Sequence, residues 1–203
     1  LDQAAKSCNA ILNVWYPGSL GGRAAAHVLF GKTSPSGKLP VTFYSETNTL
    51  PDFSDYAMAG RTYRYMTEKP MYPFGFGLTY GDVAVTAAQA ENSVKGEAVK
   101  LQVTVHNSGA ETDDVVQVYI RPEGSAFAPV NPSLCAFTRV HLGKNETRTV
   151  ELTVPAASFT VVNEAGERVC DTDRFTLFCG MGQPDERTEE LTGHKSVAVA
   201  VEF

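Results

Sequence analysis

Apolar residues occupy every second position from Val99 to Val105, and this alternation is the feature that most constrains the fold. The polar residues Lys100, Gln102 and Thr104 stand between them. Because side chains along a strand point to opposite faces in turn, the pattern predicts a β-strand with one face buried and the other in solvent. The turn sequence at 107–109 follows at once, which favours an antiparallel partner.

Further short apolar segments continue this pattern toward the C-terminus. They lie at 116–120, 137–142, 150–154, 160–162 and 175–178, separated by turn residues. The pairs 161–162 and 168–169 flank a loop with a glycine at 166, which predicts a β-hairpin. Seven or so strands of this kind predict an all-β fibronectin-III or immunoglobulin-like sandwich over residues 82–181, followed by a tail, 182–203, whose end adds an edge strand.

Residues 1–44 follow a different pattern, typical of an α/β domain. The run at 10–15 is short and nearly all apolar, as in a buried parallel strand, and ends at a Tyr-Pro-Gly turn. Ser19 is then expected to cap a short helix that Gly31 terminates, before an extended stretch at 39–43. One and a half such units cannot close a parallel sheet, so the sequence predicts an α/β fragment with an incomplete parallel sheet that continues outside this chain.

Residues 45–81 form an aromatic-rich linker between these two parts, which predicts an extended segment held against other domains by its rings. Its most distinctive cluster is Arg61, Tyr63, Arg64 and Tyr65, because Arg and Tyr side chains can stack on sugars or pair with carboxylates across a domain boundary. Trp15, at the end of the first apolar run, has two interpretations, a platform that stacks on a sugar and a side chain packed in the core or at a domain boundary. We interpret all five as candidate domain-interface or substrate-adjacent residues.

Composition argues against several classes of partner. The net charge of −6 disfavours nucleic-acid binding, and no apolar run reaches the roughly 20 residues that cross a bilayer. The four cysteines show no metal-ligand spacing, so we interpret them as thiols, which favours a cytoplasmic location. We identify no cofactor-binding or metal-binding residues.

The sequence also offers no pair of catalytic carboxylates. Asp52 with Asp55, and Asp113 with Asp114, are close together but lie in turn-like segments, where we expect solvent to keep them ionised. A catalytic acid needs burial that raises its pKa. We therefore assign no catalytic residue.

Both parts of the chain resemble family 3 glycoside hydrolases of the β-glucosidase type. The motifs that carry the resemblance, in family order, are AILNVWYPG (10–18), GGRA (21–24), PSGKLPVTF (35–43), GRTYRY (60–65), YPFGFGLTY (72–80), VHNSG (105–109) and DVVQVY (114–119). The first three are similar to the end of that family's α/β-sandwich domain, and the last two to its fibronectin-like domain.

The resemblance implies that the parent protein is a retaining β-glycosidase, whose two carboxylates stand about 5 Å apart. In that family the nucleophilic Asp lies in a TIM barrel and the acid/base Glu lies earlier in the α/β domain, and neither motif has a matching position here. We therefore expect the chain to position domains, to be inactive alone, and to have as partners the missing barrel, the rest of the α/β domain and a β-linked glucoside. The alternative is a stand-alone carbohydrate-binding or adhesion sandwich, which the lack of regularly spaced aromatics on the strands disfavours.

Overall fold

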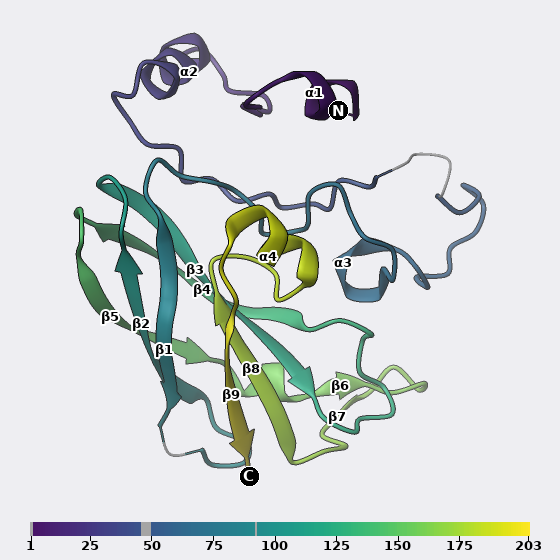
Figure 1. The fold of residues 1–203 in the computed structure, drawn as a ribbon. Helices are drawn as coiled ribbons and strands as arrows, with labels where there is room; N and C mark the ends of the chain where they lie inside the picture. Colours follow the sequence, from purple (N-terminus) through teal and green to yellow (C-terminus); the bar gives the residue numbers. More distant parts are fainter. Residues whose placement is uncertain (1, 46–49, 92) are drawn as a thin grey trace.

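The computed structural model describes residues 2–45, 50–91 and 93–203. Its body is a sandwich of two antiparallel sheets (Figure 1). One sheet has the order β1-β2-β5, formed by Val83–Ala90, Val99–Asn107 and Thr147–Val154. The other has the order β4-β3-β8-β9, formed by Ser133–Leu142, Thr112–Pro122, Arg174–Gly180 and Val197–Glu202. The predicted sandwich is therefore confirmed, as is the C-terminal edge strand.

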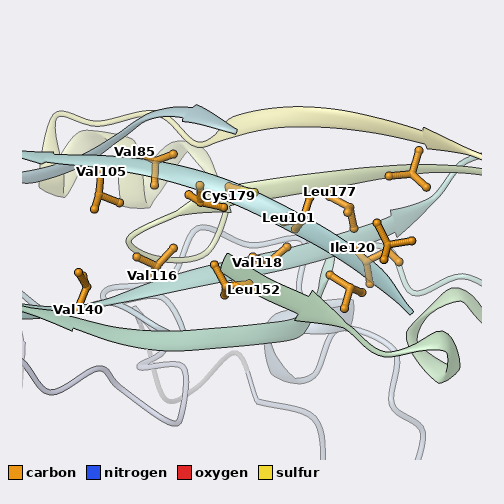
Figure 2. Close-up of a cluster of buried hydrophobic side chains, with 14 of the residues drawn as sticks. Val85, Leu101, Val105, Val116, Val118, Ile120, Val140, Leu152, Leu177 and Cys179 are labelled. Carbon is orange, nitrogen blue, oxygen red and sulfur yellow. The ribbon is translucent and has the colours of Figure 1, made fainter. Parts of the chain in front are cut away.

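The alternating residues that led to this prediction are part of the core, where Figure 2 shows Leu101 and Val105 among side chains from both sheets. Val99, Leu101, Val103 and Val105 of β2 are fully buried, and they face the apolar residues of β3 and β8 across the sandwich. Each such side chain stabilises the fold by about 1.5–3 kcal/mol relative to an exposed one. The polar residues between them remain partly exposed, as the period of two requires.

Smaller elements complete the sandwich. The predicted hairpin is present as β6 (Val161–Val162) and β7 (Arg168–Val169), which follow a short 3-10 helix at Ala156–Phe159. Helix α4 (Glu186–Thr192) lies between β8 and β9. Strand β1 was not predicted, because its β-branched residues, Val83, Val85 and Thr86, stand only in its first half and alanines fill most of the second.

The N-terminal region differs from its prediction. It contains helix α1 (Asp2–Ser7) and helix α2 (Gly21–Leu29), and the described residues between 2 and 45 form no β-strand. The expected parallel strand at 10–15 is therefore absent there. Ile11 and Val14 are 40% and 42% exposed, and an isolated extended segment has no neighbouring strand to complete its hydrogen bonds.

Helix α2 confirms the predicted helix, with one correction at its start. Its N-cap is Leu20 and no side chain caps it, so the role expected for Ser19 is wrong. Gly31 does follow the helix with a positive φ of 67°, as predicted for the terminator.

The linker crosses one end of the sandwich and contains a single turn of helix, α3 (Thr62–Tyr65) (Figure 1). Phe43 and Tyr72 form an antiparallel bridge, which joins the end of the N-terminal region to the linker. The rings of Tyr63 and Phe74 pack against Tyr119 of β3, so the predicted attachment by aromatic residues is confirmed for this half of the linker.

Candidate functional site

A buried ion pair joins the N-terminal region to the sandwich. Lys38 Nζ lies 2.8 Å from Asp114 Oδ1 on β3 and donates a second hydrogen bond, also 2.8 Å, to the carbonyl oxygen of Gly77. The two charged side chains are only 10% and 6% exposed. Three segments far apart in the sequence therefore meet at one ammonium group.

The environment of Asp114 contradicts the prediction of a solvated turn residue. Burial raises the pKa of Asp114 above its ordinary value, although the neighbouring Lys38 ammonium acts in the opposite direction. Asp113 points to the other face of β3 and pairs with Arg139 at 2.8 Å. The two adjacent carboxylates differ because successive strand residues face opposite sides of a sheet.

Backbone contacts hold the linker against residues 37–39. Leu39 N donates to Phe76 O and Gly75 N donates to Leu39 O, both at 2.8 Å. At Gly77, a Cβ atom would lie 2.1 Å from the carbonyl oxygen of Gly37. Glycine is therefore required at position 77 by the close approach of the two backbones.

Gln117 of β3 connects the linker to the end of β8. Its amide nitrogen donates to Gly75 O at 2.9 Å and to Met181 O at 3.1 Å, and its side-chain oxygen accepts a 2.7 Å hydrogen bond from the Tyr119 hydroxyl. Gln117 is 3% exposed and Tyr119 is fully buried, which raises the pKa of the Tyr119 phenol. Such a buried, satisfied network fixes one arrangement of its members.

Aromatic packing surrounds this network. Tyr63 of α3 stacks on Phe74 with ring centroids 4.2 Å apart, and both rings meet Tyr119 edge-on at 6.2 and 6.4 Å. The Tyr63 hydroxyl accepts a hydrogen bond from Leu134 N of β4. Ring pairs of this kind contribute about 0.5–1.5 kcal/mol beyond the area that they bury.

Asn131, in the loop before β4, binds the backbone of α3. Its side-chain nitrogen donates to Tyr63 O at 2.8 Å and Met66 O at 2.7 Å, and its backbone nitrogen donates to Arg64 O at 2.9 Å. These bonds satisfy carbonyls that a one-turn helix leaves free. Sequence reasoning missed Asn131, because an Asn before a Pro in a loop indicates only a turn.

The structure places the five predicted site residues in three surroundings. Tyr63 and Arg64 lie together at the sandwich, with the Arg64 guanidinium 5.8 Å from the centre of the Tyr63 ring, while Tyr65 is half-buried. Arg61 instead donates to the carbonyl oxygens of residues 52 and 55 in the first half of the linker. Trp15 has a positive φ of 48°, is 51% exposed and lies 6.5 Å from Phe43 between ring centres.

A cavity of about 190 Å³ lies where the linker meets α4, and three carboxylates line it, those of Glu68, Asp185 and Glu186. Burial raises the pKa of Asp185, but its Oδ1 accepts a 2.6 Å hydrogen bond from Thr188 N as the N-cap of α4. This carboxylate therefore has a structural partner. In the part of the chain that the structure describes, no three His, Cys, Asp or Glu residues are grouped to hold a metal ion.

The remaining sequence predictions concern cysteines and membranes. The four cysteines are free: Cys179 is buried, Cys135 is half-buried, and Cys8 and Cys170 are exposed. Among the described residues, no helix is long and apolar enough to span a bilayer.

Comparison with known proteins relates both parts of the chain to carbohydrate-cleaving enzymes. The glycosyl hydrolase family 3 C-terminal domain matches residues 1–80, and the fibronectin type III-like domain matches residues 114–183. A xylan 1,4-β-xylosidase of Xylanibacter ruminicola is 41% identical over 195 residues, which are 95% of this chain and 22% of that protein.

Solved structures of carbohydrate-cleaving enzymes are also similar to this chain. A β-glucosidase from Erythrobacter marinus is similar with a TM-score of 0.79 and 30% identity, over 98% of this chain and 26% of its own. The β-glucosidase from Listeria innocua in complex with glucose is similar with a TM-score of 0.75 and 27% identity, over 98% of this chain and 28% of its own. The chain therefore spans only about a quarter of the length of these proteins.

Proposed function

Since this chain belongs to glycosyl hydrolase family 3, as the C-terminal region of such an enzyme, we propose that it positions the catalytic domains of a retaining β-glycosidase and supplies no reacting carboxylate itself. The substrate class is a β-linked glucoside or xyloside, the sugars named for its relatives. Residues 1–44 belong to the α/β domain, 45–81 are the linker, 82–181 are the fibronectin-like domain and 182–203 are the tail.

The observation that carries this proposal is the network that joins the three parts of the chain. The Lys38–Asp114 pair, the Gln117 network and the Tyr63–Phe74 stack hold Lys38, Tyr63 and residues 74–77 against β3 at once. Each of these contacts lies within the chain, the first two are buried and the ring stack is half-buried, which supports a structural role. A retaining mechanism needs two carboxylates about 5 Å apart. Contacts that fix the relative positions of the domains therefore affect the rate of hydrolysis directly.

The partner of the N-terminal region is the rest of the parent enzyme. Large apolar side chains on this region and on the first half of the linker are exposed to an extent that isolated domains avoid. They are Leu20 (68%), Leu29 (70%), Phe30 (82%), Tyr16 (99%), Phe53 (94%) and Tyr56 (86%). We propose that the missing part of the α/β domain and the barrel cover this surface.

The stand-alone binding module has less support. Among the described strand residues, Phe137 of β4 is the exposed aromatic side chain, at 67%. A polysaccharide-binding face normally presents several rings in a row.

The test is a glycosidase assay on three samples: this chain, the full-length parent enzyme, and the parent without residues 1–203. We expect only the full-length parent to hydrolyse 4-nitrophenyl β-glucoside or β-xyloside at a substantial rate. Turnover by this chain alone, or full activity in its absence, would contradict the proposal.

A further inference from the structure

A polar junction surrounds the Lys38–Asp114 pair. We define it as Ser34, Lys38, Tyr80, Thr112 and Asp114. The Ser34 hydroxyl oxygen accepts hydrogen bonds from Tyr80 N at 2.9 Å and from the Thr112 hydroxyl at 2.7 Å. The Tyr80 hydroxyl donates to Val28 O of α2 at 2.6 Å. The junction therefore connects α2, the loop after it, the end of the linker and the start of β3.

The junction is directional, unlike the apolar packing around it. Lys38 must lie between Asp114 Oδ1 and Gly77 O to satisfy its ammonium group, and both distances are 2.8 Å. Ser34 likewise joins Thr112 and Tyr80 through one oxygen atom. Sliding the loop along β3 would separate the buried Asp114 carboxylate from its charged partner and would break the hydrogen bonds of Ser34 with Thr112 and Tyr80, and each such loss is unfavourable.

Stability alone does not account for a buried ion pair at this position. Removing two charges from water opposes folding, and pairs of this kind can often be replaced by apolar residues of similar size without loss of stability. What an apolar pair lacks is a defined register between the two segments. The loop at 34–38 leads from α2 into the linker, so its register on β3 sets how the N-terminal region lies relative to the sandwich.

We propose that Lys38 and Asp114 are positioning residues for the parent enzyme's reaction, which hold the α/β domain at a fixed orientation on the fibronectin-like domain. This inference rests on the proposed function. The pair contacts no substrate; it acts through the placement of the domain that carries the catalytic acid. Its loss therefore reduces kcat more than it changes KM.

The test compares two variants in the full-length parent enzyme and in this 203-residue chain. Lys38→Met removes one charge, and Lys38→Met/Asp114→Leu removes both and leaves no unpaired group. The matched control is Lys100→Met/Glu151→Leu, because Lys100 and Glu151 form an exposed ion pair, 3.5 Å apart, on the other sheet. The readouts are kcat and KM of the parent, thermal unfolding of the chain, and exchange of the Leu39 and Gly75 amides.

We expect the double variant to unfold near the wild-type temperature but to lose kcat, by up to about a hundredfold for a misplacement of 1 Å. The Leu39 and Gly75 amides should exchange faster than in the wild type, while the control keeps wild-type values throughout. Wild-type kcat and wild-type amide protection in the double variant would overturn the inference. A wild-type parent that hydrolyses no β-glycoside would instead overturn the proposed function, and the amide exchange would still decide whether the pair sets the register.

Discussion

The observed environment of Asp114 differs from the one that its neighbouring residues in the sequence predict. Two adjacent Asp residues in a polar stretch indicate a solvated turn, and Asp113 does lie in solvent beside Arg139. Asp114 is buried because β3 extends to residue 112 and because Lys38, from a distant loop, reaches the same face. Neither fact can be derived from the residues next to Asp114.

The raised pKa of Asp114 predicts a specific pH dependence of stability. Between its ordinary value of 3.8 and the raised value, the folded chain keeps a proton that the unfolded chain has lost. The contribution of Asp114 to the free energy of unfolding therefore decreases as the pH rises through this window. We expect Asp114→Asn to lack this decrease, measured by urea unfolding at a series of pH values.

Asp113→Asn is the matched control, and its effect has the opposite sign. The hydrogen bond from Arg139 lowers the pKa of Asp113, so its stabilising contribution is present above 3.8 and is lost as the pH falls through the lowered value. If the two variants differed from the wild type in the same direction, the account of Asp114 would be wrong.

Gln117 supports a second prediction at the residue scale. Gln117→Leu leaves the carbonyl oxygens of Gly75 and Met181 and the Tyr119 hydroxyl without this partner. We expect the free energy of unfolding to fall by about 1–3 kcal/mol. Gln102→Leu is the control, because that side chain lies on the solvent side of β2; a fall of the same size in both variants would contradict the role of the buried network.

The secondary structure of a single element could be predicted where the residues of that element alone determine it. The alternation in β2 is enough to bury one face, and α2 has apolar residues at helical spacing with a glycine after them. The segment 10–15 was not predictable, because an apolar run becomes a strand only when other strands lie beside it. The role of α3 was also hidden, since a single turn of helix depends on Asn131 from another part of the chain.

Helix α4 gives a prediction at this scale. Asp185 caps the helix through Thr188 N, and Arg187 in its first turn donates to Met71 O of the linker at 3.2 Å. We expect Asp185→Ala to lower stability by about 0.5–2 kcal/mol and to speed exchange of the Thr188 amide. Glu186→Ala, which leaves the cap in place, is the control. Unchanged exchange at Thr188 in the Asp185 variant would show that the cap does not hold the helix.

The two parts of the molecule differ in how they bury their apolar residues. The sandwich buries its own core, whereas many large apolar residues of the N-terminal region, such as Leu20, Leu29 and Phe30, remain exposed. The alternation that begins at residue 99 predicted the buried core of the sandwich, whereas the parallel strand predicted at 10–15 is absent from the described residues. The contacts between the two parts could not be predicted, since they depend on pairs such as Lys38 with Asp114 that only the folded chain brings together.

Amide exchange of α2 tests most directly whether the N-terminal region belongs to a larger body. The helix has nine residues and two large exposed apolar side chains beside its ends, Leu20 and Leu29, so by itself it should open readily. We predict fast exchange of its amides from residue 24 to residue 29 in this chain at low concentration, and slow exchange of the same amides in the full-length parent. Equally slow exchange in the isolated chain would contradict the claim that this region needs the rest of the enzyme.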